Sequence, residues 1–283
     1  MGAAVAAVRE HHLCAVAVDV RRMTLPFDES AARGAPVVCL PWFGTSRVTT
    51  REALGPALAG APVRLVYPDL PGHGDARGLP EATSEAVLAA VVSFIEEQVQ
   101  EPVLLAGCSY GGYLASAVAR RRPELVLGLL LVCPGVRQER DLPGPPHVPA
   151  EADWLDDAPD SLHEHLERAI GSRTRAVVQR VAAALVAGGP GDEGYQDALQ
   201  GGDAYFFADE DKDEDPGTFD LPVVVLTGKQ DRIVGFADQF RRMSAYPRGT
   251  FVVADLAGHY LPYERPEVLR GASLDWLRRC GVG

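Results

Sequence analysis

Short apolar runs alternate with longer amphipathic stretches along most of this 283-residue chain. Such runs, bounded by turn-forming residues, are typical of strands buried on both faces, and the stretches between them are long enough for covering helices. Six runs have the length of a buried strand: residues 36–40, 63–67, 102–106, 125–132, 222–227 and 250–254. This alternation predicts an α/β fold with a mostly parallel sheet and helices on both of its faces.

The stretches between the runs have the spacing of helices. Residues 81–99 repeat apolar side chains every three or four positions, which predicts a long helix. Shorter helices are predicted at 46–60, 111–121 and 266–279. Two further runs near the N-terminus, 13–20 and 22–27, are short, and we expect an antiparallel hairpin there at one edge of the sheet.

The pattern changes between the fourth and fifth of the six long runs. Residues 137–219 contain several prolines and no convincing strand, but amphipathic helices are predicted near 160–170 and 173–187. A helical block between two strands of a parallel sheet is typical of a cap over the carboxyl ends of the strands. Counting the N-terminal hairpin, this cap follows the sixth strand. We therefore expect a core of residues 1–136 and 220–283 with a helical cap at 137–219.

Composition narrows the range of partners. The formal net charge of −12 disfavours binding to nucleic acids or to anionic membrane surfaces, and no apolar run has the length of a bilayer span. The five cysteines are an odd number without CxxC or Cys/His spacing, so neither a disulfide framework nor a zinc site is expected. We expect a cytoplasmic protein that binds a small-molecule substrate; the oligomeric state is not readable from the sequence.

The strongest chemical signal is Gly-Cys-Ser-Tyr-Gly at residues 107–111, a G-x-S-x-G motif that follows a predicted strand and opens a predicted helix. A serine hydroxyl is a weak nucleophile until a base removes its proton, so it must protrude where a histidine can reach it. A sharp strand-to-helix turn provides this exposure, and glycines on both sides leave room for the turn. Ser109 is therefore the candidate nucleophile.

Two further residues follow later strands. Asp231 comes shortly after the run 222–227, and His259 shortly after the run 250–254. Parallel strands place their carboxyl ends at one edge of the sheet, so both side chains are expected near Ser109. Asp231 would orient His259 and stabilise its charged form. Asp255 is a weaker alternative acid, and Asp231 also suits the N-cap of a following helix.

The motifs at Ser109, Asp231 and His259, in this order, together with Asp-Leu-Pro-Gly-His-Gly at residues 69–74, resemble the α/β-hydrolase superfamily from about residue 35 onward, the cap excepted. The resemblance implies a Ser-Asp-His triad and no metal or organic cofactor. It also implies that two backbone N–H groups stabilise the oxyanion. These are Tyr110, directly after the nucleophile, and Phe43, although Trp42 is an alternative to Phe43.

Aromatic residues are the candidates for substrate contacts. We expect Trp42, Tyr205, Phe206 and Tyr260 to line the substrate site, although Tyr205 and Phe206 are equally suited to pinning the cap. His163 and His165 lie on a predicted cap helix without a third ligand at metal spacing, so a solvated face is expected for them.

The predicted function is hydrolysis of a small or medium hydrophobic ester or thioester through an acyl-enzyme intermediate. Acyl transfer to another acceptor, or cleavage of a C–C bond in a 2-hydroxy-6-oxo-dienoate-type substrate, is an alternative on the same triad. The C–C reaction is weakened because relatives with that activity usually carry Trp after the histidine, where this chain has Tyr260. An alternative of another class is a non-catalytic protein that keeps the fold to bind a small molecule.

Overall fold

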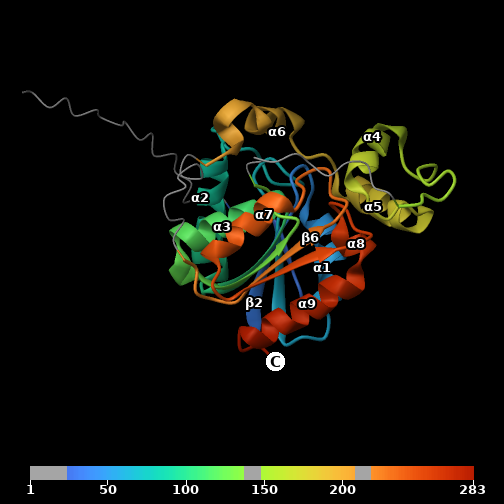
Figure 1. Ribbon diagram of the computed structural model, residues 1–283. Helices are drawn as coiled ribbons and strands as arrows, with labels where there is room; N and C mark the ends of the chain where they lie inside the picture. Colours follow the sequence, from blue (N-terminus) through green and yellow to red (C-terminus); the bar gives the residue numbers. More distant parts are fainter. Residues whose placement is uncertain (1–23, 137–147, 208–217) are drawn as a thin grey trace, which may run out of the picture.

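A seven-stranded sheet forms the centre of the computed structural model, which describes residues 24–136, 148–207 and 218–283 (Figure 1). The strand order is β1-β3-β2-β4-β5-β6-β7. β1 pairs antiparallel with β3, and every other pair is parallel. The strands are β1 (Phe27–Glu29), β2 (Ala35–Leu40), β3 (Val63–Pro68), β4 (Val103–Cys108), β5 (Val126–Val132), β6 (Val223–Gly228) and β7 (Gly249–Ala254).

Helices cover both faces of the sheet, as the alternation of the sequence predicts. The core helices are α1 (Arg47–Leu58), α2 (Ser84–Phe94), α3 (Tyr110–Arg121), α7 (Ala237–Arg241), α8 (Leu261–Glu264) and α9 (Pro266–Arg279). The apolar cluster on one face combines side chains of α1 and α9 with alternate residues of the central strands, for example Val37 and Leu104. The cluster on the opposite face combines α2 and α3 with the intervening residues, for example Val38 and Leu105. The predicted mostly parallel sheet between two helical layers is confirmed.

At the edge next to β3 the structure covers only part of the predicted hairpin. Residues 13–20 and 22–23 lie outside the described residues, and residues 24–26 form no strand. A short strand, β1, follows at Phe27 and pairs antiparallel with β3 through Phe27 opposite Pro68. Among the described strands, the helical insertion therefore follows the fifth one, β5.

The insertion between β5 and β6 contains three α-helices in its described part: α4 (Asp160–Ala169), α5 (Arg175–Gly188) and α6 (Glu193–Gln200). The first two match the predicted amphipathic helices. The third was not predicted, although Asp192 caps it by accepting a hydrogen bond from the N–H of Tyr195 at 3.0 Å. α4 and α5 lie together on one side of the molecule, and α6 lies apart from them near α2 (Figure 1). In the described residues, no helix has the length and apolar character needed to cross a membrane.

Candidate active site

Ser109 occupies a strained turn between β4 and α3. Its φ of 51° and ψ of −115° lie in a region that non-glycine residues rarely adopt. The surrounding glycines are required by close backbone contacts. A Cβ at Gly107 would lie 2.4 Å from the carbonyl oxygen of Gly111, and a Cβ at Gly111 would lie 2.4 Å from that of Leu40. The tight turn leaves Ser109 only 6 % exposed, at the wall of a pocket.

Asp231 and His259 lie at the ends of neighbouring strands, β6 and β7. His259 Nδ1 donates a hydrogen bond to Asp231 Oδ2 at 2.9 Å, and the Asp231 carboxylate is fully buried. The other oxygen, Oδ1, accepts from the N–H groups of Ile233 and Val234 at 2.8 and 3.0 Å. With both oxygens engaged, the carboxylate has a fixed orientation toward the imidazole. The alternative acid, Asp255, instead accepts a hydrogen bond from Gln230 Nε2 at the surface.

Ser109 and His259 line the same pocket, whose volume is about 730 Å³. Within the described part of the chain they are not hydrogen-bonded to each other. Catalytic hydrogen bonds are often long before substrate binds, so this arrangement is compatible with proton transfer between them. The structure thus joins two of the three predicted triad residues directly and brings the third to the same cavity.

The loop after β2 lies against the turn that carries Ser109. The N–H of Gly111 donates to the carbonyl of Pro41 at 2.9 Å, and the Phe43 ring lies 5.5 Å from the ring of Tyr110. Among the described residues, the backbone N–H groups of Tyr110, Phe43 and Trp42 donate to no other protein group. Tyr110 is therefore available as one oxyanion donor, and either residue of the pair Trp42 and Phe43 is available as the second.

The predicted aromatic residues all border the pocket. Trp42, Tyr205, Phe206 and Tyr260 lie in its wall together with the apolar side chains of Val136, Ile233 and Val234. Their contact with a substrate stays a prediction.

His165 makes a contact that the sequence did not predict. His165 is exposed overall and borders the pocket. Its Nε2 lies 2.9 Å from the hydroxyl of Tyr260, a buried residue. Desolvation of the ring, with smaller effects from the charges of His259 and Arg168, lowers the pKa of His165. His165 is thus exposed, as expected, and its ring also contributes a polar group to the pocket wall through its contact with Tyr260. Helical periodicity could not show this, because the partner lies 95 residues away.

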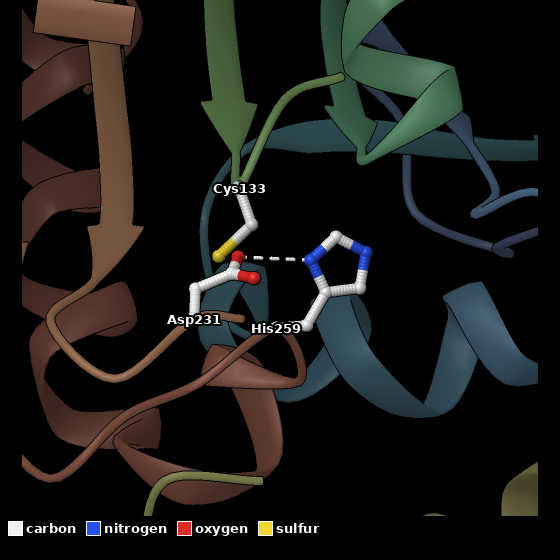
Figure 2. Close-up of side chains that lie close together, drawn as sticks. All are labelled: Cys133, Asp231 and His259. Carbon is white, nitrogen blue, oxygen red and sulfur yellow. Dashed lines mark hydrogen bonds and ion pairs between the residues drawn. The ribbon is translucent and has the colours of Figure 1, made fainter. Parts of the chain in front are cut away.

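The sequence also gave no reason to place Cys133 in the site. This fully buried residue follows β5, has a φ of 43° and donates its thiol hydrogen to the carbonyl of Gly258 at 3.5 Å. Figure 2 shows its sulfur beside the Asp231–His259 pair. Desolvation raises the pKa of the thiol well above its usual value, with the negative charge of Asp231 as a further cause. Cys133 therefore places a neutral thiol within 4.8 Å of ligand atoms of the candidate acid and base.

A buried carboxylate holds the loop of His259 against the insertion. Glu264 Oε2 accepts hydrogen bonds from the N–H groups of Gly171 and Ser172, both at 2.7 Å, and its Oε1 accepts from Gly258 at 2.8 Å. The N–H of His259 itself donates to the carbonyl of Ala169, the last residue of α4, at 2.6 Å. The position of the candidate base is therefore fixed partly by the inserted segment.

The sequence model described as the alpha/beta hydrolase family matches residues 34–272 of this chain. Among curated proteins, the lipase LipV of Mycobacterium tuberculosis is 34% identical over 74 residues, which are 26% of this chain and 28% of the lipase. The pimeloyl-[acyl-carrier protein] methyl ester esterase of Sodalis glossinidius is 34% identical over 99 residues, which are 35% of this chain and 33% of the esterase. The matched segments span about a third or less of each of these relatives.

Solved structures resemble almost the whole chain. An alpha/beta superfamily hydrolase from Oenococcus oeni PSU-1 has a TM-score of 0.78 at 24% identity, with 90% of this chain and 96% of that chain covered. A thermophilic esterase from Thermogutta terrifontis has a TM-score of 0.67 at 24% identity, with 90% and 93% covered. At this level of identity the likeness establishes the fold.

Proposed function

This chain belongs to the alpha/beta hydrolase family, and from that premise we propose that it is a serine hydrolase of small or medium hydrophobic esters or thioesters. Ser109 is the nucleophile, His259 the general base and Asp231 the residue that orients the base. The observation that carries the proposal is the strained, pocket-lining Ser109 in the same cavity as a histidine bonded to a fully buried carboxylate. The esterase and lipase names of the matched relatives agree with it.

In the proposed reaction, His259 accepts the hydroxyl proton of Ser109 through Nε2 while the serine oxygen attacks the substrate carbonyl. Asp231 stabilises the imidazolium through the hydrogen bond at Nδ1. The N–H of Tyr110 and that of Phe43 or Trp42 donate to the developing oxyanion. His259 then protonates the leaving alcohol or thiol, and water releases the acid from Ser109 in a second, equivalent step.

The composition of the pocket supports the substrate class. Its wall combines aromatic and aliphatic side chains with the charged groups of Arg168 and Asp203, and its volume suits an acyl or alkyl group of modest size. Residues of α4, of α6 and of the turn 202–206 border it, so we propose that the inserted segment acts as a cap over the bound substrate.

The test is ester hydrolysis by a pair of serine variants. Ser109→Ala should lower kcat for short aryl esters and acyl thioesters by about 10⁴-fold or more, because the nucleophile is lost. Ser116→Ala, two turns further along α3, is the matched control and should retain wild-type rates. Mass spectrometry after exposure to a fluorophosphonate should find one adduct on Ser109.

Equal rates for wild type and Ser109→Ala would refute the mechanism. A fluorophosphonate adduct without turnover of any ester or thioester would instead favour transfer to another acceptor or C–C cleavage. Neither adduct nor turnover would indicate a binding protein.

A further inference from the structure

We propose that Cys133, Asp231 and His259 form a binding site for a thiophilic divalent cation, of the class of Zn²⁺ and Cd²⁺, which inhibits the enzyme when occupied. The thiol sulfur, a carboxylate oxygen and an imidazole nitrogen all lie within 4.8 Å of one another. The three side chains converge from the ends of β5, β6 and β7 (Figure 2). Cys133 and Asp231 are 0 % exposed and His259 is 3 % exposed.

The donor set matches the preference of these ions. Zn²⁺ binds thiolate, imidazole and carboxylate ligands, commonly three from the protein with water in the fourth position. Known bond lengths place such ligands about 3.5 Å apart around the ion. The present spacing therefore needs side-chain shifts of only about 1 Å. His259 borders the pocket, which gives solvent and the ion a route to the fourth position.

The ligand atoms are free to turn toward an ion. Asp231 is anchored through Oδ1 by two backbone N–H groups, so Oδ2 can exchange the imidazole for the ion without losing that anchor. The hydrogen bond of Cys133 to Gly258 is weak, since a thiol is a poor donor. Its φ of 43° is a backbone conformation that non-glycine residues rarely adopt, and Figure 2 shows the thiol beside the pair.

Occupancy changes the protons of the site in a defined way. The thiol proton of Cys133 leaves to solvent when the sulfur binds the ion. When the ion binds Nδ1, the proton that Nδ1 donated to Asp231 leaves to solvent, and the neutral imidazole takes up a proton from solvent on Nε2 instead. His259 then has no lone pair at Nε2 to accept the proton of Ser109, and its hydrogen bond to Asp231 is lost. The prediction of inhibition therefore depends on the proposed function, whereas the prediction that the ion binds does not.

Binding is tested with Cd²⁺, because cadmium–thiolate coordination adds an ultraviolet charge-transfer band. The full chain carrying Cys14→Ser and Cys280→Ser, which removes two competing thiols, is titrated with Cd²⁺ after treatment with a chelator. One equivalent should produce the band, and the further change Cys133→Ser should remove it. An unchanged band in the Cys133→Ser protein would overturn the proposal. If Cys133→Ser fails to give a thermal unfolding transition, Cys133→Ala replaces it.

Inhibition is tested separately with Zn²⁺ in the ester assay. Zn²⁺ should inhibit the wild-type protein, a chelator should restore the rate, and Cys133→Ser should raise the inhibition constant by at least about 10-fold, the loss expected for a weakened metal site. Cys280→Ser is the matched control and should be inhibited like wild type. Equal inhibition of the Cys133→Ser protein would overturn the proposal. Absence of hydrolysis by the metal-free protein would instead refute the proposed function, and the cadmium band would still decide the site.

Discussion

Two aspartates near the end of the sheet illustrate how burial assigns chemical roles to single residues. Asp231 is enclosed, and both of its oxygens are engaged, one by two backbone N–H groups and the other by His259. Asp255 is solvated. The pKa of its carboxyl is lowered, mainly because Gln230 donates a hydrogen bond to it. A buried charge interacts more strongly with its neighbour than an exposed one does, because less water screens it. We therefore assign the proposed orienting role to Asp231 and not to Asp255.

Replacing each aspartate in turn tests this assignment. Asp231→Asn should lower kcat by about 10³- to 10⁴-fold, because an amide that donates to Nδ1 holds the imidazole in the wrong tautomer. Asp255→Asn should leave kcat unchanged. Steady-state hydrolysis of an aryl ester measures both. A larger loss for Asp255→Asn than for Asp231→Asn would reverse the assignment.

At the scale of elements, the site depends on how the loop after β7 joins the insertion after β5. Glu264, at the end of α8, is the central group of this junction because it accepts three backbone hydrogen bonds from both segments. Gly258 belongs to the same junction, since a Cβ there would lie 2.1 Å from the carbonyl of Ala169. Desolvation raises the pKa of Glu264 to about 7, helped by the charge of Asp231 and opposed by the three N–H donors.

The raised pKa predicts a pH-dependent stability. The folded state holds the Glu264 proton more tightly than the unfolded state, whose pKa is near 4.5. The resulting stabilisation is complete below pH 4.5 and is lost as the pH rises through about 7. Glu264→Gln removes this contribution. The difference in unfolding free energy between variant and wild type should therefore shift by about 3 kcal/mol in favour of the variant between pH 4.5 and pH 8.

Denaturant unfolding at a series of pH values measures this shift. Glu267→Gln is the matched control, because Glu267 is exposed and its pKa is lowered, first of all by Arg265. A difference between Glu264→Gln and wild type that stays constant across this pH range would contradict a raised pKa in the folded state.

For the molecule as a whole, the two apolar clusters on either face of the sheet hold the strand ends in position. Trp276 on α9 is fully buried in one of them, and its indole N–H donates to the carbonyl of Pro222, just before β6, at 3.3 Å. It also packs against Gly128 of β5, where a Cβ would lie 3.1 Å from the indole nitrogen. This side chain fixes α9 across the two strands that lead to Cys133 and Asp231.

Removing the indole should therefore lower stability without altering the chemistry. Trp276→Ala should reduce the unfolding free energy by about 3–5 kcal/mol, because it leaves a large cavity in the core. KM should stay near the wild-type value at temperatures where the variant is folded. Val186→Ala, at a side chain 62 % exposed, is the control and should change stability by about 0.5 kcal/mol or less. A loss for Trp276→Ala no larger than for this control would show that α9 is not needed to hold the sheet.

Local patterns in the sequence are enough to predict the features that depend on neighbours along the chain. Apolar runs and helical spacing were sufficient to predict the parallel sheet and its covering helices, because both record which face of an element is buried. The glycines around Ser109 predicted a sharp turn between strand and helix. Helix α6 was within reach of the same reasoning, since Asp192 is a recognisable N-cap. Asp231 and His259 were found because each follows a strand-like run.

Which distant residues meet depends on how the elements pack together. The order of strands sets β5 beside β6 and β6 beside β7, which brings Cys133 against residues 98 and 126 positions later in the chain. The same folding turns His165 toward Tyr260 and places Glu264 between two segments. The spacing of residues along the chain does not predict such contacts. They arise where elements pack together, and the local pattern does not specify how the elements are placed relative to one another.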